Sequence, residues 1–167
     1  AQGDLLWVDG VIFDITAQKE AEAALAESED HLSTLAAHVP GAIYRSLPDE
    51  HWTDLYMSDG IEELTGYPAA DFVNGEARHL GDLCHPEDRD AYFDSEITRE
   101  PHIDEYRIIH RDGGIRWIQD RNRGIYDENG EVLWIDGLLF DVTVQKEAET
   151  ALAASENQFR TMVDNMP

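Results

Sequence analysis

One segment occurs twice in this chain, once near the start and once near the end. Residues 3–29 read GDLLWVDGVIFDITAQKEAEAALAESE, and residues 130–156 read GEVLWIDGLLFDVTVQKEAETALAASE. The two copies align without a gap at a constant offset of 127 residues, which places Trp7 on Trp134. Solenoid repeats have periods of about 20–50 residues, so this longer period indicates successive copies of a whole domain. The duplication therefore predicts that the chain contains parts of more than one domain copy.

Each copy of the repeat has a strand-like part followed by a helix-like part. VLWIDGLLFDV is rich in bulky and β-branched residues, which favour a strand. From Gln145 to about Asn165 the chain is rich in Ala, Glu and Gln and has no Gly or Pro, which predicts a long helix. The predicted division of the chain is the last strand of a preceding repeat (1–16), a linker helix (17–40), a complete domain (41–143) and a C-terminal linker helix (144–167).

The strand predicted for residues 3–14 has no domain of its own in this sequence. An apolar strand with free edges seeks a pairing partner. We expect this segment to pair with a strand of its own chain or of a dimer partner, where it could replace the native last strand by domain swapping, or else to be poorly ordered.

Both predicted helices carry small and apolar residues at alternating spacings of four and three. This heptad pattern predicts parallel helix pairing in a homodimer, and the alternative is an amphipathic helix that lies on its own domain. The heptad positions of the second helix are Ala148, Leu152, Ser155, Phe159, Met162 and Met166. Those of the first helix are Ala21, Leu25, Ser28, Leu32, Leu35 and Val39.

Residues 41–129 show mixed α and β patterns. GAIYRS and TDLYMS predict two short strands, and GIEELTGYPAADF predicts short helices. A further helix, HPEDRDAYFDSEITRE, is predicted to begin at Pro86, and three strands follow with hairpin turns at Asp112-Gly113 and Asn129-Gly130. Strands at both ends with helices between them predict an α+β fold, in which an antiparallel sheet carries helices on one face.

Charge and cysteine content exclude several classes of function. The net charge of -24 argues against nucleic acid or anionic membranes as partners, because binding to phosphates relies on Lys and Arg. Lys19 and Lys146 are the only lysines, which suits a protein adapted to high salt or an ordinary acidic protein. A single cysteine, Cys84, excludes an intrachain disulfide and a cysteine-based zinc site. Without an apolar run of about 20 residues or a leader segment, we expect a cytoplasmic location.

Several motifs, in this order, resemble the PAS domains of bacterial and archaeal sensor proteins. They are GIEELTGYPAADF, LCHPEDRD, DEYRIIHRDGGIRWI, DENGEVLWIDGLLFDVT, which is similar to the PAC-type motif, and the linker QKEAETALAASE. The resemblance covers residues 41–143 completely. It implies a PAS fold, with a five-stranded antiparallel sheet that holds a pocket against short helices. It also implies dimerisation, and transmission of a signal through the helix that leaves the last strand.

The corner between the last strand and the helix reads DVT in the second copy and DIT in the first. It resembles the junction between sensor and output helix in the family. A carboxylate and a hydroxyl at such a corner can cap the helix and pair with a basic side chain from a neighbouring strand. The alternative is a local helix cap with no role in switching. The candidate junction residues are Asp141, Thr143, Asp14 and Thr16, with Arg107 or Arg116 as the basic partner.

Aromatic and polar residues on the predicted strands could line a ligand cavity. Alternation places Trp117 and Gln119 on one face of their strand, and Tyr106 could face them from its neighbour. The candidate cavity residues are Tyr44, Tyr56, Tyr106, Trp117 and Gln119. The alternative is a filled core with a polar outer face.

Neither of two known PAS cofactors is favoured by the sequence. Covalent flavin binding comes with a cysteine in an Asn-Cys-Arg-Phe-Leu-Gln-like helix, whereas Cys84 stands in DLCHPED. Haem needs a histidine in the pocket, for which His79, His85 and His102 are the candidates, and a lone histidine is more often structural. A small organic ligand, or no ligand, is the remaining expectation. No metal site is predicted, because no His-x-x-x-His pair is present.

No catalytic motif was found in the sequence. It lacks a serine in a nucleophile-elbow pattern and a glycine-rich loop next to a lysine. We therefore expect a regulatory module of a multidomain signal-transduction protein, a two-component sensor for example. Its effector, such as a histidine kinase or a diguanylate cyclase, would lie outside this chain. The alternative is a ligand-free spacer that dimerises and relays a conformational signal.

Overall fold

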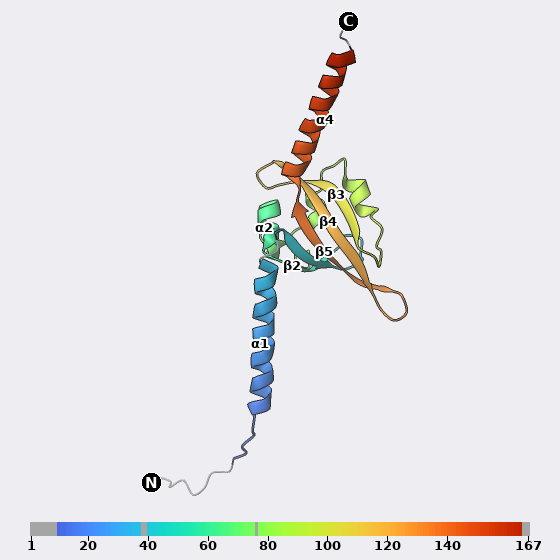
Figure 1. Cartoon of the computed structure of the whole chain (residues 1–167). Helices are drawn as coiled ribbons and strands as arrows, with labels where there is room; N and C mark the ends of the chain where they lie inside the picture. The colour runs from blue at the N-terminus through green and yellow to red at the C-terminus, as the bar shows by residue number, and fades with distance from the viewer. Residues whose placement is uncertain (1–9, 38–39, 76, 165–167) are drawn as a thin grey trace, which may run out of the picture. The chain divides into compact units, whose positions relative to one another are not determined.

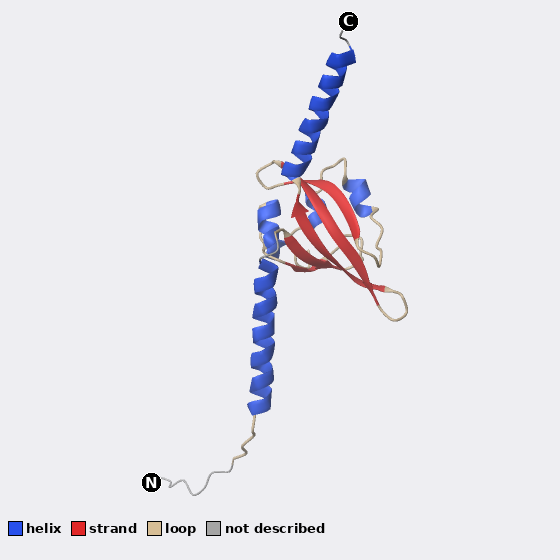
Figure 2. Cartoon of the chain, in the orientation of Figure 1, coloured by secondary structure: helices blue, strands red, loops and turns tan. Residues whose placement is uncertain are grey.

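The computed structural model describes residues 10–37, 40–75 and 77–164 of the chain. These residues belong to two compact units, Ala1–Leu35 and Ala36–Pro167. The first unit contains most of helix α1 (Thr16–Ala37). Every residue of this helix from Thr16 to Glu27 is exposed. The second unit contains all other elements, and Figure 2 shows its strands as one sheet.

The sheet of the second unit has five antiparallel strands in the order β2-β1-β5-β4-β3. The strands are β1 (Ala42–Ser46), β2 (Asp54–Met57), β3 (His102–Ile109), β4 (Ile115–Tyr126) and β5 (Val132–Asp141). The short helices are α2 (Gly60–Thr65), η1 (Ala69–Asp71), η2 (Leu80–Leu83) and α3 (Arg89–Phe93). Helix α4 (Thr143–Asp164) continues directly from β5 (Figure 1). The prediction of an α+β fold built on a five-stranded antiparallel sheet is confirmed.

The core lies between the sheet and the short helices. Alternating residues of the strands point inward, so that Ile108 of β3, Ile118 of β4 and Leu139 of β5 are almost completely buried. Ile61 of α2 and Phe72 after η1 pack against them from the helical side. This packing leaves the opposite face of the sheet for polar and half-buried side chains.

The helix predicted from Pro86 onward is much shorter than expected. Only Arg89–Phe93 is helical, and the following residues run alongside the sheet. The Gly124 amide donates to the Thr98 carbonyl at 2.7 Å, and the Tyr126 hydroxyl donates to the Ile97 carbonyl at 3.1 Å. In a longer helix the Ile97 and Thr98 carbonyl groups would accept hydrogen bonds from within the helix. Here they accept them from β4 instead.

The duplicated strand at the N-terminus is described only from Gly10 onward. Residues 10–15 form neither helix nor strand, and Val11, Ile12 and Phe13 are exposed. Pairing of residues 10–15 with a strand of their own chain is therefore not found, while residues 3–9 of the predicted strand lie outside the described part. Pairing with a strand of another chain stays a prediction.

Candidate functional site

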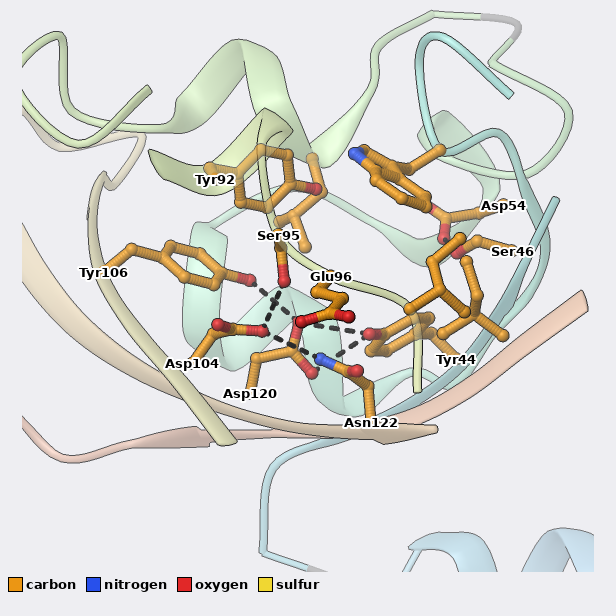
Figure 3. A pocket seen from close by; sticks show the side chains of 14 residues that line it. Tyr44, Ser46, Asp54, Tyr92, Ser95, Glu96, Asp104, Tyr106, Asp120 and Asn122 are labelled. Atoms are coloured by element: carbon orange, nitrogen blue, oxygen red, sulfur yellow. Dashed lines mark hydrogen bonds between the residues drawn. The ribbon is translucent and has the colours of Figure 1, made fainter. Parts of the chain in front are cut away.

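A cavity of about 50 Å³ lies between the inner face of the sheet and the segment from α3 to β3. Figure 3 shows tyrosine, carboxyl and hydroxyl side chains that converge on it. Its lining residues are Tyr44, Ser46, Trp52, Asp54, Leu80, Tyr92, Ser95, Glu96, Ile97, Asp104, Tyr106, Asp120, Asn122 and Ile135.

Strand register explains why the polar lining residues meet. Asp104 of β3 stands opposite Asp120 of β4, so both side chains leave the same face of the sheet. Tyr44 of β1 stands opposite Gly137 of β5, and a side chain at position 137 would collide with the Tyr44 ring. Because Gly137 has no side chain, the Tyr44 ring can lie across β5 and reach Asp120 on β4.

Asp120 is a buried carboxyl group of the cavity wall, with an exposed fraction of 6% for the residue. The Tyr44 hydroxyl lies 3.0 Å from each of its oxygens, and the Tyr106 hydroxyl lies 3.5 Å from Oδ2. Burial raises the pKa of Asp120 to about 7, because a charged carboxylate loses its hydration there. Burial also raises the pKa of both tyrosines, so they stay protonated and can donate to Asp120.

Asp54 is a second buried carboxyl group in the cavity wall, with an exposed fraction of 3%. The Ser46 hydroxyl donates to its Oδ1 atom at 2.6 Å. Burial raises the pKa of Asp54 to about 7, and this hydrogen bond only partly offsets the effect. The cavity therefore holds two carboxyl groups that change charge near neutral pH.

Asp104 differs from these two groups because three side chains surround it. Ser95 Oγ donates to its Oδ2 at 2.8 Å, and Asn122 Nδ2 donates to the same atom at 3.2 Å. His102 Nε2 lies 3.1 Å from Oδ1. Asp104 thus has partners on both carboxyl oxygens.

The structure separates the five candidate cavity residues into two groups. Tyr44 and Tyr106 line the cavity, whereas Tyr56, Trp117 and Gln119 do not. Tyr106 pairs with Ile118, so it lies on the face opposite to Trp117 and Gln119, and our expectation that the three face each other is wrong. Tyr56 is 46% exposed and also belongs to the outer face, where its pairing partner is Arg45.

Sequence reasoning missed most of the polar cavity residues, including Asp54, Asp120 and Asn122. An aspartate in a strand is usually assigned to the solvent side, and both faces of β4 carry apolar residues. Asp120 and Asn122 have the same parity as Ile118, but the burial of Ile118 is visible only in the structure, so the sequence held no signal for them.

Three of the candidate junction residues meet at the corner between β5 and α4. Arg116 Nη1 donates to Asp141 Oδ2 at 3.0 Å, and the Thr143 amide donates to Asp141 Oδ1 at 2.8 Å. The Trp117 amide donates to Thr143 Oγ1 at 2.9 Å. Partial burial raises the pKa of Asp141, but the hydrogen bonds from Thr143 and Arg116 outweigh it and hold the pKa below its usual value.

Outer-face residues of the sheet extend this junction to the next turn of α4. Lys146 Nζ donates to Glu105 Oε2 at 2.5 Å, and the pKa of Glu105 is lowered by this bond and by the one from Gln119. The same ammonium lies 5.6 Å from the centre of the Trp117 ring. Trp117 and Gln119, expected in the cavity, thus contact the residues that hold α4.

The other candidate junction residues have partners outside this corner. Arg107 pairs with Asp88 and Glu87 and not with Asp141, which leaves Arg116 as the basic partner. In the first copy, the Thr16 amide donates to Asp14 Oδ1 at 2.9 Å, which matches the bond between Thr143 and Asp141.

Neither a cysteine for a covalent flavin nor a histidine for a haem lines the cavity, among the residues that the structure describes. Cys84 is buried away from the cavity lining, and burial raises the pKa of its thiol to about 11, so it is a poor nucleophile. His79, His85 and His102 are absent from the lining residues, within the described part of the chain. Among the described residues, no cluster of His, Cys, Asp and Glu could hold a metal ion.

Within the ranges that the structure describes, no helix combines the length and apolar character needed to cross a membrane.

Comparison with known proteins agrees with this architecture. Residues 54–139, about half of the chain, match the family model of the PAS fold. The methyl sulfide methyltransferase-associated sensor of Methanosarcina acetivorans is 30% identical, over 93% of this chain and 18% of the sensor. The two-component sensor PprA of Pseudomonas aeruginosa is 27% identical, over 99% of this chain and 18% of its own length. The chain thus spans about a fifth of the length of these relatives.

A solved structure of a sensory box histidine kinase/response regulator from Burkholderia thailandensis has the same fold. It is 26% identical with a TM-score of 0.58, over 77% of this chain and 97% of the other. Sheet order, helices on one face and sequence match thus agree, and the chain belongs to the PAS-fold family of sensory and regulatory domains.

Proposed function

We propose that this domain senses the content of its cavity and reports it to α4 through strand β4. The observation that carries the proposal is the double role of β4. Asp120 and Asn122 point from one face of β4 into the cavity, while Arg116 and Trp117 hold the start of α4. A ligand that moves or charges Asp120 therefore acts on the strand that fixes α4.

The proposal includes an output through helix pairing. Leu152, Phe159 and Met162 of α4 are 60–68% exposed and follow the heptad spacing. Exposed apolar side chains at this spacing favour a parallel contact with α4 of a second copy. We propose a homodimer through the linker helices, with a downstream effector such as a histidine kinase or a diguanylate cyclase in the parent protein. The buried free thiol of Cys84 suits a reducing, cytoplasmic location.

A cavity-filling substitution tests whether the cavity acts on α4. Ile135→Phe adds volume at the cavity wall from β5, and Leu133→Phe adds a similar volume at an exposed position of that strand. We expect Ile135→Phe to change amide hydrogen exchange in the first two turns of α4 at least threefold, and Leu133→Phe to leave it unchanged. Equal exchange in the two folded variants would contradict the proposal and favour a ligand-free dimerisation and relay module.

A further inference from the structure

The ionisable residues that line the cavity are acids and tyrosines. Four of them carry carboxyl groups, and none is a lysine, an arginine or a histidine. The carboxyl groups come from β2, β3, β4 and the segment after α3, and Figure 3 shows them around a common space. They are Asp54, Asp104, Asp120 and Glu96.

One of these carboxyl groups lacks a full set of partners. Asp54 accepts one side-chain hydrogen bond, from Ser46 to Oδ1, and its Oδ2 receives none from the described part of the chain. The residue is nevertheless only 3% exposed, and it lines the cavity. A carboxyl oxygen that is free of protein donors and belongs to the cavity wall can accept a hydrogen bond from a ligand. A ligand in the cavity that carries an N–H group would supply the missing donor.

Four aromatic rings form part of the remaining wall. Tyr44, Tyr92, Tyr106 and Trp52 all line the cavity, and the rings of Tyr92 and Tyr106 meet edge to face at 5.0 Å. Aromatic rings attract cations through their electron-rich faces, most strongly where water is excluded. Trp52 also has a backbone φ of 52°, a conformation that non-glycine residues adopt rarely and often at functional sites.

The size of the cavity limits the ligand. A volume of about 50 Å³ offers roughly four water-sized positions. A ligand of about three to five non-hydrogen atoms fills such a space.

From these observations we infer that the cavity binds a small alkylammonium ion, with its charge held by Asp54 and Asp120 and its alkyl groups against the aromatic rings. The inference rests on the proposed function, since it names the ligand class of the same cavity. The net charge of -24 favours the same class, because the field of the whole chain attracts cations and repels anions.

Cation binding at this site is coupled to protons. Asp120 faces Tyr44, Tyr106, Tyr92 and Asp104, and none of these groups brings a positive charge near it. The pKa of Asp120 and that of Asp54 are raised to about 7, so both are partly protonated at neutral pH. A bound cation favours the charged carboxylates, so binding releases protons and tightens as pH rises from 6 to 8.

Titration calorimetry of the 167-residue chain tests the inference with three probes of similar size. They are trimethylammonium chloride, the neutral tert-butanol and the anion acetate, each at pH 8 in the same potassium chloride buffer. We expect trimethylammonium to bind at least tenfold more tightly than tert-butanol, acetate to give no binding heat, and the affinity for trimethylammonium to fall severalfold at pH 6.

Two variants locate the binding site. Asp54→Asn and Asp120→Asn keep the side-chain size but remove the charge, and each is expected to weaken trimethylammonium binding at least tenfold. Asp136→Asn removes a carboxylate from the outer face of β5, where Asp136 pairs with Arg45, and should leave the affinity unchanged. The two cavity variants provide independent tests if one of them fails to fold.

The outcomes separate this inference from the proposed function. Equal binding of tert-butanol, absence of trimethylammonium binding, or full affinity in both cavity variants would overturn the inference, whatever α4 does. Hydrogen exchange of α4 is read separately. Trimethylammonium that binds through Asp54 and Asp120 without changing exchange in α4 would support the inference and contradict the proposed function.

Discussion

At the scale of single residues, the domain is defined by carboxyl groups that it buries without a basic partner. Asp120 accepts hydrogen bonds from the Tyr44 and Tyr106 hydroxyls, and no lysine, arginine or histidine lines the cavity around it. A buried charge without a cation is unfavourable, and the raised pKa shows that the group keeps its proton up to about pH 7. Burial of the Asp120 carboxyl group lowers stability at neutral pH, so its presence in the core is better explained by a function than by a contribution to stability.

The first prediction concerns the pH dependence of stability. The folded pKa of Asp120 is about 7, above its unfolded value, so the stabilisation it contributes is complete below about pH 4 and is lost as pH rises to 7. For one such group the loss amounts to roughly 4 kcal/mol at most. We expect the free energy of unfolding of Asp120→Asn to fall less between pH 5 and pH 8 than that of the wild type.

Urea unfolding at pH 5 and pH 8 measures this difference. Groups such as Asp88, whose pKa is lowered by Arg107, act in the opposite direction and lose their stabilisation only as pH falls below about 4. They therefore contribute little between pH 5 and 8. Parallel pH profiles for the wild type and Asp120→Asn would contradict the prediction.

At the scale of elements, β4 contacts both the cavity and the start of α4. Asp120 and Asn122 line the cavity, whereas Arg116, on the same face of the strand, and Trp117 contact the corner at which α4 begins. The Trp117 amide and carbonyl both bond to the start of α4, at Thr143 and Val142. This arrangement makes β4, and not the turn between β5 and α4 alone, the element that sets the position of the helix start.

The second prediction concerns the ion pair of Arg116 and Asp141. Both side chains are about a third exposed, so Arg116→Gln should cost only about 0.5–1 kcal/mol of global stability. The larger effect should be local: faster amide exchange at the start of α4, since Asp141 loses one of the bonds that orient it. Arg123→Gln, in the same strand but opposite Asp136, is the matched control. Unchanged exchange in α4 of Arg116→Gln would refute this role.

Much of the element order could be predicted from the sequence, and the cavity only in part. Alternation and turn residues such as Asp112-Gly113 predicted the hairpins, because these signals are local. Which face of β4 is buried could not be predicted, because Trp117 and Ile118 are both apolar and point to opposite sides of the sheet. For the basic partner of Asp141, the sequence left Arg107 and Arg116 as alternatives. Packing against α3 and the following segment decides which face of the sheet is buried, and that information is not local.

At the scale of the whole molecule, the duplicated segment gives the domain one helix before it and one after it in the sequence. Helices α1 and α4 have equal lengths of 22 residues and arise from the same repeated sequence. A signal that reaches α4 of one domain copy would reach the next copy through a linker of the same kind. The pairing surfaces of these helices are thus expected to be equivalent.

The third prediction concerns the dimer. Phe159→Glu places a charge in the exposed apolar stripe of α4 and should shift the chain to a monomer at micromolar concentration. Asn157→Glu adds the same charge outside the heptad positions and should leave the dimer intact. Light scattering coupled to gel filtration measures the mass. A dimer that survives Phe159→Glu would place the interface elsewhere, for example on the sheet.

The most direct test of the account is the distance between the two α4 helices of a dimer, measured between spin labels at position 157. We predict that filling the cavity by Ile135→Phe shifts this distance, and that Arg116→Gln abolishes most of the shift while Arg123→Gln preserves it. An unchanged distance in a folded, dimeric Ile135→Phe variant would show that the cavity and α4 are not coupled, and would contradict the central claim.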